Sequence, residues 1–193
     1  MPLIEPNSLL SLEAYSRERN AYRSRVIAHK KLRTVHVGGH VTLIFEDELT
    51  IRYQVQEMLR IERIFEAEGI RGELEAYNPL IPDGANWKAT MLIEYPEEEE
   101  RRRRLAELKG IEDRTWVEVA GCARVFAIAD EDMERENEEK TSAVHFVRFE
   151  LSREMRDALK KGAELSVGID HPNYRSSVTV AREVRQSLAG DLA

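Results

Sequence analysis

The alternation of apolar and polar residues along the chain predicts helices and strands in mixed order. Apolar residues recur at helical spacing after Ser8, whereas strict alternation after Trp87 predicts a half-buried strand. The same reasoning, with caps and turn residues as boundaries, predicts helices over residues 8–33, 48–68, 97–109, 152–161 and 181–188. It predicts strands within residues 34–45, 87–95, 115–129, 143–151, 165–169 and 176–180.

Turn residues indicate how these elements connect. The Gly38-Gly39 pair favours a hairpin, Gly69 is placed to end the second helix, and the prolines of residues 69–84 predict a loop. Short connections between strands favour antiparallel pairing. We therefore expect an α+β fold over residues 1–193, in one domain, with a largely antiparallel sheet packed against a long N-terminal helix and several shorter helices.

Three polar residues interrupt faces that the pattern predicts to be buried. Glu62 lies in the apolar stripe of the second predicted helix. His145 shares a strand face with Val147, and His171 follows Ile169 where a strand runs into a turn. A buried carboxylate or imidazole costs stability unless it is paired or bound to a metal, so these positions are candidates for chemistry.

Two histidines and one carboxylate are the ligand set of many iron and zinc sites. We therefore expect Glu62, His145 and His171 to bind iron or zinc. Hydrogen bonds between these ligands and three further polar residues would orient the ligands: Asp170, Tyr174 and Gln54. The alternative for each candidate ligand is a side chain satisfied inside the core by a neighbouring group.

Composition excludes several classes of protein. The single Cys122 among 193 residues can form neither an intrachain disulfide nor a cysteine cluster, so an iron–sulfur cluster would belong to a partner. No apolar run approaches the ~18 residues of a membrane helix, which predicts a cytoplasmic protein without a membrane span. The chain has no HExxH, Walker, GxGxxG or GxSxG motif, and whether it is an enzyme stays open.

The formal net charge of −7 conceals an uneven distribution of charge. The first predicted helix is basic, and residues 130–139 are acidic. Nucleic-acid binding by the first helix is disfavoured because Tyr15 and Tyr22 lie on its apolar stripe, where they cannot stack on bases. Whether the chain forms a homo-oligomer stays open.

Five stretches of this sequence resemble an uncharacterised bacterial family of about this length that carries only a domain-of-unknown-function label. They are residues 54–60, 77–82, 86–91, 140–146 and 170–174. The resemblance implies a genomic context, because such proteins are often encoded beside rubrerythrin-like proteins and iron–sulfur oxidoreductases of the heterodisulfide-reductase type. It implies redox or iron chemistry, and it assigns no activity and no catalytic residue.

Two functions from different classes follow from these observations. The first is a metal-binding protein with a redox or oxidative-stress role, built on Glu62, His145 and His171. The second is a non-catalytic accessory module that docks onto a rubrerythrin-like or iron–sulfur partner. Docking would use the basic first helix and the acidic residues 130–139.

Overall fold

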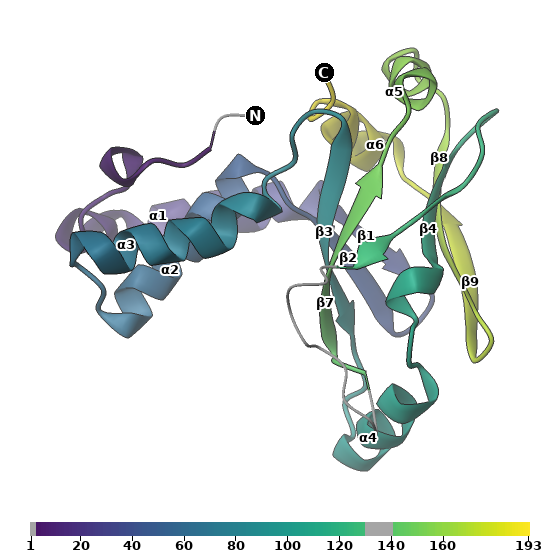
Figure 1. The fold of residues 1–193 in the computed structure, drawn as a ribbon, viewed down its shortest axis with the longest axis horizontal. Helices are drawn as coiled ribbons and strands as arrows, with labels where there is room; N and C mark the ends of the chain where they lie inside the picture. The colour runs from purple at the N-terminus through teal and green to yellow at the C-terminus, as the bar shows by residue number, and fades with distance from the viewer. Residues whose placement is uncertain (1–2, 130–140) are drawn as a thin grey trace.

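The molecule consists of a body of two antiparallel sheets and an arm of three helices that projects from one side of it (Figure 1). The computed structural model describes residues 3–129 and 141–193, so the acidic segment singled out in the sequence lies outside the described residues. The predicted α+β class is confirmed, with its antiparallel strands divided between two sheets rather than gathered in one.

Helices occupy the arm and both ends of the body (Figure 1). The arm holds α1 (Leu12–Lys31), α2 (Glu48–Glu62) and α3 (Ala67–Tyr77), and the body carries α4 (Glu98–Glu107), α5 (Arg153–Lys160) and α6 (Arg182–Ala189). The described residues also include three short 3-10 helices: η1 (Pro6–Ser8), η2 (Asn78–Leu80) and η3 (Glu112–Arg114). The described helices do not include one that is long and apolar enough to cross a membrane.

Every strand pairing within the described residues is antiparallel. The first sheet runs β1 (Thr34–Val37), β2 (Val41–Phe45), β3 (Asn86–Ile93), β7 (Val144–Glu150) and β6 (Ile128–Ala129). The second runs β5 (Val125–Phe126), β4 (Thr115–Val119), β8 (Leu165–His171) and β9 (Tyr174–Thr179).

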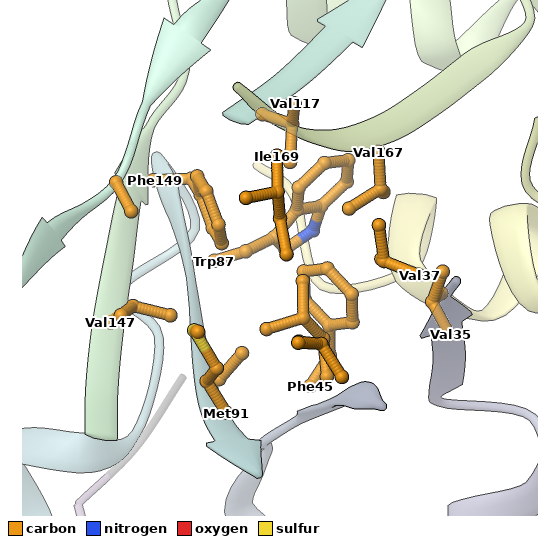
Figure 2. Packing of buried hydrophobic residues seen from close by; sticks show 14 of the residues in the cluster. Val35, Val37, Phe45, Trp87, Met91, Val117, Val147, Phe149, Val167 and Ile169 are labelled. Carbon is orange, nitrogen blue, oxygen red and sulfur yellow. The ribbon is translucent and has the colours of Figure 1, made fainter. Parts of the chain in front are cut away.

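The main core lies between the two sheets. Alternate residues of each strand point to the same face of their sheet, and the apolar face of each sheet points toward the other sheet. Phe45, Trp87 and Phe149 of the first sheet meet Val167 and Ile169 of the second (Figure 2). Burial of these side chains follows the alternation that predicted the strands from the sequence.

One glycine is required by packing on the outer face of the second sheet. Gly168 lies opposite Trp116 in the register, and the indole ring covers it. A Cβ at this position would lie 2.2 Å from Cζ2 of the indole, so only glycine leaves room for Trp116.

The arm has a separate, smaller core. Its buried residues come from the start of the chain, from α2 and α3, and from the loop that follows: Ile4, Ile51, Val55, Leu59, Leu74 and Ile81. The arm therefore holds together through its own apolar contacts as well as through its attachment to the body.

The sequence prediction for the second helix was wrong at its end. The helix stops at Glu62 rather than at residue 68, because Arg63 takes a left-handed conformation with φ of 55°. The chain then reverses and forms α3 over the first half of the stretch predicted as a loop. This reversal packs Leu74 of α3 against α2, a long-range gain of apolar burial that the local pattern does not reveal.

Candidate functional site

Glu62 and Gln54 are exposed on α2, in the arm. The buried face of α2 is formed by Ile51, Val55 and Leu59 instead. The apolar stripe assumed for Glu62 continued to Phe65, but the helix ends before Phe65, whose side chain is 71% exposed. Glu62 is therefore a solvated carboxylate rather than a buried one.

His145 is buried in β7, as its place in the strand predicted. Its Nε2 lies 2.9 Å from the Thr141 hydroxyl and 3.0 Å from the Ser142 carbonyl oxygen. The carboxylate of Glu112 lies 3.9 Å from the same nitrogen. Neighbouring groups thus satisfy this nitrogen, as in a core histidine.

His171 is also buried, at the end of β8. Its Nε2 donates to the Lys109 carbonyl at 3.0 Å, and its Nδ1 accepts from the Asn173 amide at 3.2 Å. Both ring nitrogens are engaged, so this imidazole links β8 to the segment after α4 and offers no lone pair to a metal.

The two residues expected to assist the histidines have other partners. Asp170 accepts a hydrogen bond from Arg124 at 2.9 Å on the exposed face of the second sheet. The Tyr174 hydroxyl donates to the Val37 carbonyl at 2.7 Å and accepts from the His40 amide at 3.1 Å. Tyr174 therefore fastens β9 to the turn between β1 and β2.

The structure does not bring Glu62 together with His145 and His171. Glu62 lies on the arm and both histidines lie inside the body. Across residues 3–129 and 141–193 there is no group of three or more His, Cys, Asp or Glu side chains that could hold a metal ion. The geometry of the described residues therefore gives no support to the expected iron or zinc site.

A buried cluster of charges that the sequence pattern did not reveal joins the arm to the body. Arg33, just after α1, is 1% exposed and donates from Nε to the Phe45 carbonyl at 2.8 Å. Its guanidinium forms an ion pair with Asp191 after α6 and lies 3.4 Å from the Asp47 carboxylate. With His29, whose Nε2 lies 2.5 Å from Asp47 Oδ2, these residues form what we call the junction cluster.

Asp47 has two structural roles in the junction cluster. Its Oδ1 accepts from the Thr50 amide at 2.9 Å and so caps α2, while its Oδ2 faces Arg33 and His29. Burial alone would raise the pKa of Asp47, but Arg33, the Thr50 amide and His29 outweigh it and lower that pKa. Burial raises the pKa of Asp191, against the opposing effect of Arg33. The Asp47-to-Thr50 spacing of a capping box was the signal in the sequence that could have located this end of the cluster.

The outward face of α1 carries a second group of charges. Arg23, Ile27 and Lys31 are exposed and follow one another at intervals of four residues, so they form a single ridge, which we call the α1 ridge. In the described part of the chain neither Arg23 nor Lys31 forms an ion pair with a carboxylate. The helix as a whole has six Lys or Arg residues and two Glu residues.

The inward face of α1 fixes this orientation. Tyr15 and Val26 are buried. Arg19 donates from Nε to Glu57 of α2 at 2.7 Å, and this hydrogen bond lowers the pKa of Glu57 to about 2. The basic residues of α1 therefore divide into one that binds the arm together and others that face outward.

Two antiparallel sheets with a shared core and a projecting helical arm define an α+β protein with a basic surface on its arm. The chain belongs to the family of proteins of unknown function DUF3501, which matches residues 3–192. The resemblance to a family that carries only a domain-of-unknown-function label is thus confirmed, whereas the genomic context that it implied stays a prediction.

A solved structure shares this fold. It is the crystal structure of a protein of unknown function from Burkholderia pseudomallei, 55% identical to this chain, with 100% of each chain covered and a TM-score of 0.95. No curated protein matches the chain.

Proposed function

We propose that this protein is a non-catalytic docking module that binds an acidic protein partner through the α1 ridge. The observation that supports the proposal is the concentration of outward positive charge on α1 in a chain whose net charge is −7. Such a local field attracts a partner of opposite charge and orients it as it approaches.

The composition of the ridge favours a protein partner over a nucleic acid. Ile27, which is 46% exposed, and the exposed Leu32 add apolar surface beside the cations. Protein interfaces have the same composition, with an apolar core surrounded by a polar rim. The aromatic residues that would stack on bases are engaged inside the arm. Tyr15 is fully buried, and the ring of Tyr22 stacks on Tyr53.

The family resemblance suggests the chemistry of this partner. We propose a rubrerythrin-like or iron–sulfur redox protein with an acidic surface. Iron, zinc or a cluster would then belong to the partner, since this chain has one Cys and its described residues offer no group of metal ligands. The redox and oxidative-stress role expected from the sequence would be exercised through that partner.

The test measures binding of the full chain to a purified acidic rubrerythrin-like protein by titration calorimetry at low and high salt. Binding is expected at low ionic strength, with a loss of about tenfold or more in affinity at high salt. The double variant R23E/K31E is expected to weaken binding by at least about tenfold, because two attractions become repulsions.

A matched control distinguishes the effect of the α1 ridge from the effect of a change in the net charge of the protein. The double variant R102E/R103E changes two exposed arginines of α4 by the same charge and is expected to leave binding within about twofold of the unchanged protein. Three results would overturn the proposal. They are no binding at low salt, equal losses in both variants, and tighter binding to an RNA or DNA oligonucleotide than to the acidic protein.

A further inference from the structure

A pocket with a volume of about 340 Å³ lies where the arm meets the outer face of the first sheet. This volume is near the lower end of the roughly 300–1,000 Å³ that is usual for small-molecule sites, so the pocket suits a metabolite rather than a macromolecule. Six side chains give it its chemistry: Glu46, Leu80, Lys88, Ile128, Phe146 and Arg148.

Glu46 is the most unusual of these residues, because it is a carboxylate only 7% exposed. The Thr90 hydroxyl donates to its Oε1 at 2.6 Å, and the Thr50 hydroxyl donates to its Oε2 at 2.5 Å. In the part of the chain that the structure describes, Glu46 forms no ion pair with a cationic side chain. A buried carboxylate held only by neutral donors is stabilised when a cation compensates its charge, and the ammonium group of a ligand would supply one.

Two cationic side chains line the same pocket. The Lys88 ammonium donates to the Ile81 carbonyl at 3.0 Å and also to the Pro79 carbonyl, so its role is to hold the loop that carries Leu80 against the sheet. Arg148 stands at the rim, with Glu150 2.7 Å from its Nε. The pocket therefore has a carboxylate, Glu46, and a guanidinium, Arg148, within one small volume.

The rest of the lining is apolar. Leu80, Ile128 and Phe146 come from η2, β6 and β7, so three separate segments supply apolar wall between the charged groups. A ligand that matches this lining carries an ammonium group, an anionic group and an apolar side chain on a compact framework.

We infer that the pocket binds a free α-amino acid with an apolar side chain. The ammonium group pairs with Glu46, the carboxylate faces Arg148, and the side chain packs against Leu80, Ile128 and Phe146. This site is independent of the α1 ridge, because the two share no residue.

Titration of the full chain with L-phenylalanine and L-leucine, followed by calorimetry and ligand-observed NMR, tests this inference. Binding in the millimolar range or tighter is expected. N-acetyl-L-phenylalanine lacks the ammonium group, and phenethylamine lacks the carboxylate, so each is expected to bind at least about tenfold more weakly than L-phenylalanine.

Variants assign the two ends of the ligand. Glu46→Gln keeps the shape of the side chain and one of its two acceptor oxygens but removes its charge, and it is expected to weaken amino-acid binding by at least about tenfold. Glu75→Gln, at an exposed position of α3, is the matched control and is expected to leave binding unchanged. Arg148→Gln alters an exposed side chain at the carboxylate end of the ligand. It therefore tests the same site if the Glu46→Gln protein does not fold.

Four outcomes would overturn the inference. They are no binding of either amino acid up to about 10 mM, equal binding of L-phenylalanine and phenethylamine, equal binding of L-phenylalanine and its N-acetyl derivative, and unchanged binding by a folded Glu46→Gln protein. Unchanged amino-acid binding by R23E/K31E is expected, and it distinguishes a failure of this site from a failure of the docking surface.

Discussion

Ion pairs between side chains far apart in the sequence hold the arm together at the scale of single residues. Arg19 of α1 donates two hydrogen bonds to Glu57 of α2, at 2.7 and 2.8 Å. Arg60 and Tyr15 donate to the same carboxylate. Glu57 therefore connects the two helices at one point, and its charge state affects how firmly they are connected.

This pair predicts how the stability of the protein depends on pH. The hydrogen bond from Arg19 lowers the pKa of Glu57 from 4.5 to about 2. Ionised Glu57 therefore stabilises the folded protein in full above pH 4.5, and this stabilisation is lost as the pH falls toward 2. Glu57→Gln is expected to be less stable than the unchanged protein at neutral pH, and to lose less stability as the pH falls through that window. Urea unfolding at several pH values measures both effects.

Glu75→Gln is the control for this experiment, because Glu75 is exposed on α3 and forms no ion pair within the described residues. Its stability is expected to follow the pH dependence of the unchanged protein. Parallel curves for Glu57→Gln and the unchanged protein would contradict the assignment.

The histidines and Glu62 show why some residues were predicted correctly and others were not. Burial of His145 followed from its strand, because alternation fixes the face of every residue once the strand exists. Burial of Glu62 depended on the helix continuing to Phe65, which a left-handed residue prevents. The acceptor for His171 Nε2 could not be predicted, since the Lys109 carbonyl is 62 residues away.

The reversal between α2 and α3 is decided at the scale of elements. Arg63 ends α2 with φ of 55°, a conformation that favours glycine because it brings the Cβ of other residues close to the backbone. Arg63→Gly is therefore expected to stabilise the protein by up to about 1 kcal/mol, measured by urea unfolding.

The same substitution at a helical position provides the control. Arg71 is exposed within α3, and Arg71→Gly is expected to destabilise the protein by about 1 kcal/mol, because glycine loses more backbone entropy in a helix. Effects of equal sign at the two positions would show that Arg63 is not the residue that ends α2.

The junction cluster acts at the scale of the whole molecule, because it links the arm, the first sheet and the C-terminal helix. Arg33→Met leaves Asp47 and Asp191 buried without the guanidinium between them. The expected cost is about 3–5 kcal/mol of unfolding free energy. Hydrogen exchange in α1 to α3 is expected to accelerate more than exchange in the sheets, because the arm keeps only its smaller core.

Arg23→Met is the control, since Arg23 is exposed on the same helix, and its effect is expected to stay within about 0.5 kcal/mol. If Arg33→Met does not fold, Asp191→Asn tests the same cluster with a smaller change. Equal acceleration of exchange in arm and sheets would show that the cluster does not hold the arm to the body.

The sequence by itself determined the order of the strands and of the α-helices other than α3, the antiparallel pairing, the basic face of α1 and the burial of both histidines. These properties follow from local periodicity, turn residues and charge, which neighbouring residues supply. Only the tertiary structure decided which polar groups meet. Arg33 binds Asp191 across 158 residues, and the pocket around Glu46 is assembled from segments that the sequence keeps apart. Burial, rather than local pattern, selects these contacts, because a polar group removed from water needs a partner wherever the fold can place one.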